Sequence, residues 1–306
     1  MPKPRYTIKD FNRDFPDDDA CLAYVARLIY STAPENGIGC RACKVERKHH
    51  RLSTRKAYTC DYCGTHVYPL AGTIFEKSST SLKSWLYAMF LMGQTRCGIS
   101  AKQVERELGV TYKTAWRMFN QIRKLMGEEV ERLSGEVEAD ETYVGGRRRG
   151  TPRGRPGKDS HKVPVVGVVK RGGKGAALVT SDTTRASVSP IMERKVLPKS
   201  LVYTDEYKVY DHLGRKGLHP QTGEPFRANY VVGNVHTNTI EGFWSLLKNG
   251  IRGVYHSVGA KHLQSYVNEY AFRYNHRADD QAMPLLVRER VRHVRHGKHG
   301  EYAPVG

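Results

Sequence analysis

Two closely spaced pairs of cysteines constrain the fold of this chain more than any other feature of its sequence. Cys40 and Cys43 form one C-x-x-C pair, Cys60 and Cys63 form a second, and 16 residues separate the pairs. Four thiolates in this arrangement supply the tetrahedral sulfur ligands that Zn²⁺ prefers, and the intervening length suits a β-hairpin. The spacing therefore predicts a structural zinc ribbon over residues 40–68, with a redox dithiol as the alternative.

The charge balance indicates a polyanionic partner. The 306 residues include 50 Lys and Arg against 31 Asp and Glu, a net charge of +19, and the insert between the cysteine pairs is itself strongly basic. A nucleic acid is the expected partner. A membrane is not, because no stretch reaches the roughly 18–20 apolar residues of a spanning helix. The N-terminus lacks the apolar run of a signal peptide, so we expect a cytoplasmic protein without disulfides.

Composition divides the chain into five regions. These are a leader (1–39), the zinc ribbon (40–68), a helical region (80–126), a domain that alternates β-like and helical patterns (135–280) and a basic tail (281–306). Alternation of this kind is typical of an α/β or α+β domain.

Within the helical region, two helices and a tight connection resemble a helix-turn-helix. Gly109 stands where the turn is needed, and Thr111 can cap the following helix. Side chains near the start of such a helix reach base edges in DNA. The expected DNA-binding residues here are Tyr112, Lys113, Thr114 and Arg117. A plain helical hairpin with a solvated basic face is the alternative.

The third region of interest is a set of carboxylates on separate elements of the 135–280 domain. Residues 136–144 alternate as a half-buried strand does, with Asp140 opposite Val137 and Ala139. Asp205 follows the short apolar strand 201–204, and Glu241 lies within a later helix. Oxygen-rich sites of this kind suit hard divalent cations, and two such ions support phosphodiester chemistry. We therefore predict a site for two Mg²⁺ or Mn²⁺ ions on these three side chains.

Several neighbours compete for these roles. Glu138, Glu141 and Glu206 are rivals that the strand period only partly excludes. Asn238 lies three residues before Glu241, and is either a ligand or a helix-start residue. Lys248 returns to the face of Glu241 two turns later, where it would meet a phosphate or simply lie exposed.

A loop rich in Gly, Pro and Arg follows the first strand. Seven of its 16 residues, 147–162, are Lys or Arg. A loop so basic beside a strand that carries acids would clamp a nucleic-acid backbone, and mere solvated flexibility is the alternative. The expected phosphate contacts are Arg147, Arg148, Arg149, Arg153 and Arg155.

The motifs together are similar to those of a known family. The cysteine spacing, a helical segment, "VEADETYVGG", "VYTDEY", "NTIEGFWSLLK" and "EYAFRYN" resemble transposases of the bacterial insertion sequence 1595 (ISXO-like) family over roughly residues 30–280. The resemblance implies an RNase H-like catalytic domain of the acidic-triad (DDE) class. It matches Asp140 and Asp205 to the first two acids, and Glu241 with Lys248 to the E-x6-K pattern. The family is also described with asparagine as third catalytic residue, which would be Asn238.

The resemblance also implies an activity and partners. Such enzymes bind the terminal inverted repeats of their element, nick the ends hydrolytically and join the freed 3′-hydroxyls to target DNA, with a homo-oligomer, at least a dimer, holding the two ends. In a bacterium the protein would be cytoplasmic and associated with the nucleoid when bound. The alternatives are a DNA-binding regulator derived from a transposase, and an RNase H-like metal nuclease without strand transfer.

Overall fold

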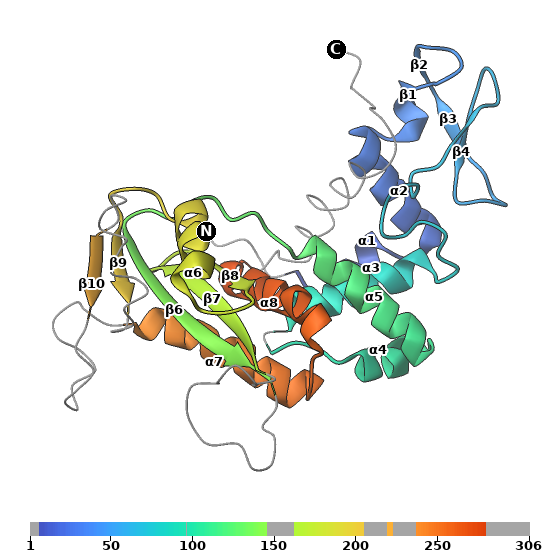
Figure 1. The fold of residues 1–306 in the computed structure, drawn as a ribbon. Helices are drawn as coiled ribbons and strands as arrows, with labels where there is room; N and C mark the ends of the chain where they lie inside the picture. The colour runs from blue at the N-terminus through green and yellow to red at the C-terminus, as the bar shows by residue number, and fades with distance from the viewer. Residues whose placement is uncertain (1–5, 96, 146–161, 205–218, 223–236, 280–306) are drawn as a thin grey trace. The chain divides into compact units, whose positions relative to one another are not determined.

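The computed structural model describes residues 6–95, 97–145, 162–204, 219–222 and 237–279 (Figure 1). The chain divides into two compact units. The first is built chiefly from Met1–Thr95 and Ala101–Met126, and the second from Arg96–Ser100 and Gly127–Ala278.

The first unit begins with two helices, α1 (Ile8–Asp14) and α2 (Asp18–Tyr30). Thr7 and Asp10 form a capping box at the start of α1. Asp17 caps α2, accepting a hydrogen bond of 2.8 Å from the amide of Ala20. The acidic run before Cys21 therefore begins α2, because a carboxylate at the cap satisfies an otherwise unpaired N–H and acids favour the positive helix end. The helix α1 was not predicted.

The cysteine segment forms short antiparallel strands. β1 (Ile38–Gly39) pairs with β2 (Glu46–Arg47), and a second sheet has the order β3 (His49–Arg51), β4 (Tyr58–Cys60), β5 (His66–Val67). A single helical turn, η1 (Pro34–Asn36), precedes them. Each cysteine pair lies on a tight turn that begins at the end of a strand, as the zinc ribbon prediction requires.

Three helices complete the first unit: α3 (Leu82–Gln94), α4 (Ala101–Leu108) and α5 (Tyr112–Leu125). Ser81 caps α3 and Thr111 caps α5, each through a hydroxyl that accepts a backbone N–H. Gly109 has φ +62°, a conformation that glycine adopts at little cost. The connection between α4 and α5 is thus the tight turn that the sequence predicts.

The second unit contains a five-stranded sheet of mixed direction. Its strands are β6 (Glu136–Val144), β7 (Val163–Lys170), β8 (Gly175–Val179), β9 (Leu201–Thr204) and β10 (His219–Thr222). The spatial order is β10-β9-β6-β7-β8; β6, β7 and β8 run antiparallel, whereas β9 runs parallel to β6 and β10 parallel to β9. This is the RNase H-like arrangement, and the chain has the predicted α+β fold with a zinc ribbon near its N-terminus.

Helices cover both faces of this sheet (Figure 1). They are α6 (Arg185–Lys195), α7 (Asn238–Gly250), which continues as the π-helical turn η4 (Ile251–Tyr255), and α8 (Ala260–Asn275). One apolar core lies between the sheet and α6, and a second lies between the sheet and α7 with α8. The prediction of a half-buried β6 is therefore wrong: Glu138 is fully buried and Thr142 is 4% exposed, because α7 covers the face that carries the acids.

Side-chain amides of α8 occupy the outer edge of β8. Gln264 accepts from the amide of Val179 (2.7 Å) and donates to the carbonyl of Ala177 (3.2 Å). Asn275 likewise accepts from the Gly175 amide (2.8 Å) and donates to its carbonyl (3.1 Å). Unpaired strand edges invite association with other strands, so these amides both protect the edge and fix α8 on the sheet.

Among the described residues, no helix has the length and apolar character needed to cross a membrane.

The close approach of α7 to the sheet gives a first prediction. A Cβ on Gly167 of β7 would lie 2.5 Å from Cη2 of Trp244, a rigid ring that cannot move aside without disturbing α7. We expect Gly167→Ala to lower the free energy of unfolding by about 1–3 kcal/mol through overpacking. Gly242→Ala, on the exposed side of α7 with nothing within 4 Å of its added Cβ, is the matched control and should stabilise by about 0.5–1 kcal/mol. Urea unfolding of both variants measures this, and equal effects would contradict the packing described.

Candidate active site and metal centre

The four cysteines converge in the way a tetrahedral zinc site requires. Cys40 Sγ lies 3.5 Å from Cys63 Sγ, Cys43 Sγ lies 3.9 Å from Cys60 Sγ, and all four sulfurs are within 4.8 Å of one another. Zinc–sulfur bonds of about 2.3 Å in a tetrahedron separate the sulfurs by roughly 3.8 Å. The donor set and its spacing thus fit structural zinc.

The surroundings of Cys63 favour the thiolate that zinc binds, whereas hydrogen bonding with the neighbouring thiols, Cys63 first among them, raises the pKa of Cys43 to about 12. The amide of Cys43 donates to Cys40 Sγ over 3.5 Å. The hydroxyl of Thr65 lies 3.1 Å from Cys63 Sγ, and the hydrogen bonds of Thr65 lower the pKa of this thiol to about 6. Outside the cluster, Cys21 is buried in α2 and Cys97 is exposed, and neither belongs to the group of sulfurs that could share an ion.

The zinc site gives a second prediction. Cys43→Ser should leave the purified chain with less than one zinc per molecule and lower Tm by about 10 °C, because structural zinc contributes folding energy directly and a few kcal/mol move Tm by this amount. Cys97→Ser removes an exposed thiol outside the cluster and should change neither quantity. Metal analysis and calorimetry report both; a full complement of zinc in Cys43→Ser would exclude this ligand set.

The outward face of α5 holds the residues expected to read DNA. Tyr112 is 48% exposed, and Lys113 and Arg117 are also exposed. Thr114 is half-buried, and its hydroxyl lies 3.0 Å from that of Thr111, so part of its polar capacity serves the helix cap. Trp116 is 36% exposed on the same helix. The sequence interpretation missed it, although its position four residues after Tyr112 places both rings on one face.

Asp140 lies in the middle of β6 under α7. Its Oδ2 accepts a hydrogen bond of 2.9 Å from Trp244 Nε1, and its Oδ1 accepts one of 2.7 Å from the amide of Glu141. Its cross-strand partner is Gly167, whose missing side chain leaves room for the Trp244 ring. The indole therefore orients the Asp140 carboxylate while the residue remains half-buried.

Glu138 lies two residues earlier on the same face of β6 and has a structural role. Its carboxylate is fully buried and accepts from Thr239 Oγ1 (2.9 Å), the Ile240 amide (2.9 Å) and Arg171 Nε (2.8 Å). It thereby caps α7 from the sheet, where Thr237 provides no side-chain cap. Glu138 is a positioning residue for α7, and no sequence signal identified it, since its partners lie up to 102 residues away.

The rival Glu141 lies on the other face of β6. Side chains alternate along a strand, so Glu141 shares the face of Val137 and Ala139, which pack in the core against α6. It is 9% exposed. Of the acids on β6, Asp140 is the one that both lies on the face toward α7 and is partly exposed beside that helix.

Helix α7 presents the other candidate side chains. Glu241 and Asn238 are both exposed in its first turn, and the hydroxyl of Thr237 donates to Glu241 Oε1 over 3.3 Å. Lys248 is half-buried; burial lowers its pKa, and the charge of Asp140 partly offsets that shift. Trp244 and Lys248, three and seven residues after Glu241, thus both interact with Asp140.

Some predicted site residues lie outside the described residues. They are Asp205, the rival Glu206, and the loop arginines Arg147, Arg148, Arg149, Arg153 and Arg155. Within the part of the chain that the structure describes, the four cysteines are the only group of three or more Cys, His, Asp or Glu side chains placed to share a metal ion.

These features define a class: an RNase H-like domain with one acid presented at the centre of its sheet, preceded by a zinc ribbon and helices. Family models agree with it. Residues 132–275 match the ISXO2-like transposase domain and residues 16–66 match the transposase zinc-ribbon domain of the IS1595 group, together well over half of the chain. The chain belongs to the IS1595 family of transposases. The zinc-ribbon match begins at residue 16 and so includes α2.

Two relatives carry compatible descriptions. The chain is 27% identical over 271 residues to an uncharacterized protein in transposable element ISH50 of Halobacterium salinarum, covering 81% of this chain and 89% of that protein. It is 28% identical over 102 residues to an uncharacterized transposase-like protein of Haemophilus influenzae, covering 32% of this chain and 78% of that protein.

Solved structures also align with this chain at low sequence identity. The Mos1 transposase paired-end complex aligns with a TM-score of 0.27 at 10% identity, covering 68% of this chain and 78% of that chain. A simian T-cell lymphotropic virus intasome aligns with a TM-score of 0.33 at 11% identity, covering 72% and 76%.

Proposed function

We propose that this transposase binds the terminal inverted repeats of its own insertion sequence, cleaves the DNA ends with divalent metal ions and joins the 3′-hydroxyl ends to target DNA. The observation that carries the proposal is the setting of Asp140. A carboxylate at the centre of an RNase H-like sheet is held by an indole N–H and lies beside a helix with Glu241 and Lys248. In a protein that only binds DNA, an ionised acid in that position would repel the phosphate backbone.

Asp205 is the proposed second acid. Strand β9 lies next to β6 and ends at Thr204, immediately before Asp205. In the parallel register, Tyr203 pairs with Glu138, two residues before Asp140. The order of the strands therefore supports the meeting of Asp140 and Asp205 at one place on the sheet.

Glu241 is the preferred third acid. Residues three, four and seven apart share one face of a helix. Trp244 and Lys248, which stand in this relation to Glu241, both interact with Asp140. Asn238 also lies in the first turn of α7. Trp244 and Lys248, however, stand three and seven residues after Glu241, so the helix face that interacts with Asp140 includes Glu241.

Asp140, Asp205 and Glu241 would hold the ions, because carboxylate oxygens are the hard ligands that Mg²⁺ and Mn²⁺ prefer. The Asp140 carboxylate is already oriented toward α7. Two such ions activate an attacking oxygen and stabilise a leaving one. The protein's own part is positional. Trp244 fixes the Asp140 carboxylate, Glu138 fixes the start of α7, and Lys248 provides a cation for a phosphate beside the acids.

DNA binding is assigned to two further surfaces. The exposed Tyr112, Lys113 and Arg117, with the half-buried Thr114, lie at the start of α5, the end of a recognition helix that meets base edges. The basic loop that carries Arg147 to Arg155 would contact the backbone near the cleavage site. A dimer that holds both ends together completes the proposed assembly.

The activity is tested with Asp140→Asn on a duplex that carries the terminal repeat bracketing this gene. We expect Mg²⁺-dependent cleavage to fall by roughly 10²-fold or more, the scale on which one lost electrostatic contact slows a reaction, while binding of the duplex is retained. The control Glu131→Gln removes an exposed acid of the same unit and should cleave normally. Cleavage that persists in Asp140→Asn would favour a regulator with a contaminating nuclease. Absence of joining by the unmodified chain from a precleaved 3′-hydroxyl end would favour a nuclease without strand transfer.

The third ligand is tested by comparing two neighbouring substitutions. Glu241→Gln should lower Mg²⁺-dependent cleavage as strongly as Asp140→Asn, because both remove one ionised ligand. Asn238→Ala should lower it much less. Cleavage rates over a range of Mg²⁺ and Mn²⁺ concentrations give the comparison. The reverse order of effects would assign the role to Asn238.

A further inference from the structure

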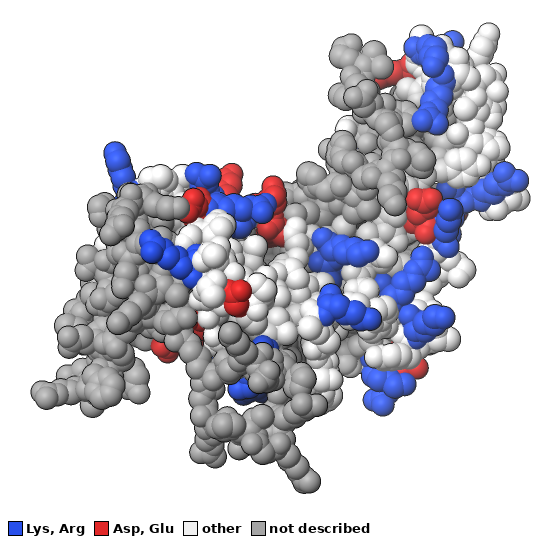
Figure 2. All heavy atoms as spheres, in the orientation of Figure 1, with Lys and Arg blue, Asp and Glu red and all other residues white. Residues whose placement is uncertain are grey.

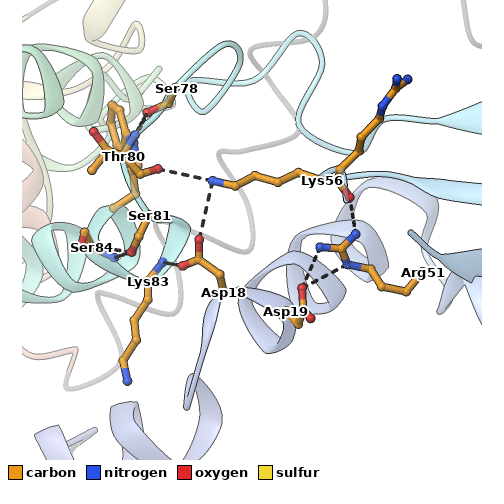
Figure 3. Close-up of polar contacts among 11 residues, drawn as sticks. Asp18, Asp19, Arg51, Lys56, Ser78, Thr80, Ser81, Lys83 and Ser84 are labelled. Carbon is orange, nitrogen blue, oxygen red and sulfur yellow. Dashed lines mark hydrogen bonds and ion pairs between the residues drawn. The ribbon is translucent and has the colours of Figure 1, made fainter. Parts of the chain in front are cut away.

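Most of the Lys and Arg residues of the zinc ribbon fall into two groups, and the inner group, Arg51 and Lys56, binds other parts of the protein (Figure 3). Arg51 forms an ion pair with Asp19 (Nη2–Oδ1 2.7 Å) and also donates to backbone carbonyls of its own turn. Lys56 Nζ lies 3.6 Å from Asp18 Oδ2 and 3.4 Å from the carbonyl of Thr80. These two cations are used to hold the ribbon.

Asp18 extends the same network to the helices. Its Oδ1 accepts a hydrogen bond of 2.9 Å from the amide of Lys83, in the first turn of α3. One carboxylate at the start of α2 thus joins a ribbon lysine to α3 (Figure 3). Within the first unit, the ribbon is therefore a fixed platform on the helices rather than a module on a free linker.

The outer group surrounds the two cysteine turns and is exposed. It consists of Arg41, Lys44, Arg47 and Lys48, against the two exposed acids Glu46 and Asp61. Lys and Arg side chains gather both on the ribbon and over α4 and α5 (Figure 2). The outer group is thus net positive and separate from the charges that hold the ribbon in place.

Tyr62 stands in this outer group and is 76% exposed, the largest exposed fraction among the large apolar side chains of the described residues. The guanidinium of Arg47 lies over its ring, 4.8 Å from the centroid. An aromatic side chain so exposed provides a flat face for a deoxyribose and a hydroxyl for a phosphate of the duplex backbone. Tyr62 and Arg47 together therefore offer a flat ring and a positive charge at one place on the surface.

The zinc site makes this surface rigid. Arg41 and Lys44 belong to the first cysteine turn and Tyr62 to the second, and the sulfur cluster holds the two turns together. The amide of Asp61 donates to the carbonyl of Lys48 over 3.0 Å, which fixes Tyr62 beside the strand of Arg47. Side chains on a preorganised scaffold lose less entropy on binding.

We propose that Arg41, Lys44, Arg47, Lys48 and Tyr62 form a second duplex-DNA contact of the first unit, in addition to that of α5. The assignment rests on the proposed function, since it takes the element end as the ligand. Two contacts in one rigid unit act at high effective concentration, so each reinforces the other, and the ribbon lengthens the stretch of DNA that one protomer covers.

The test compares Arg47→Ala and Tyr62→Ala with the control Arg55→Ala, an exposed cation of the same insert outside the outer group. Binding of an element-end duplex and of a scrambled duplex is measured with the full chain over a range of salt concentrations, and zinc content is checked for each variant. Both variants should bind the element end roughly tenfold more weakly, and Arg47→Ala should reduce the salt slope by about 1. Arg55→Ala should bind normally.

A second measurement needs no substitution. Duplexes with 5-bromodeoxyuridine at successive positions are photo-cross-linked to the unmodified chain, and the peptide carrying Tyr62 should be labelled outside the positions that label α5. Cross-links confined to α5, with unchanged affinity in both variants, would overturn the ribbon contact and leave the proposed function standing. An unmodified chain that does not distinguish the element end from the scrambled duplex would overturn the proposed function itself.

Discussion

The fully buried carboxylate of Glu138 is the contact on which the second unit depends. The carboxylate accepts hydrogen bonds from the Thr239 hydroxyl and the Ile240 amide at the start of α7. It also forms an ion pair with Arg171, in the turn after β7. Removing one partner of a buried charge pair costs about 3–5 kcal/mol, because the other charge is left unpaired. This clamp sets where α7 begins on the sheet, and so sets the position of every candidate side chain on that helix.

One turn further along, the same strand and helix meet at Asp140 and Trp244. Glu138 and Asp140 therefore differ in use: Glu138 binds α7 through both of its oxygens, and Asp140, the proposed metal ligand, keeps partial exposure beside the helix. In the first unit, charged side chains likewise fall into a structural set and the set of the proposed DNA contact. Asp18 and Asp19 hold the ribbon through Lys56 and Arg51, and other cations remain on its surface.

Local patterns in the sequence predicted much of this fold. The cysteine spacing predicted the zinc cluster, Gly109 predicted the tight turn between α4 and α5, and Thr111 predicted the start of α5. Burial of both faces of β6 was not predictable, because the polar face is covered by a helix about 100 residues later. The same distance hid the role of Glu138 and the use of α8 amides at the edge of β8. Long-range contacts, rather than local preference, decide these features.

In the proposed mechanism Asp140 binds the catalytic ion, whereas Glu138 holds the start of α7. The most direct measurement is anomalous scattering from crystals of the chain with Mn²⁺ and an element-end duplex. We expect an Mn²⁺ peak bonded to the Asp140 carboxylate, with Glu138 still hydrogen-bonded to the Ile240 amide and paired with Arg171. An ion on Glu138, or ions only at sites away from Asp140, would contradict it.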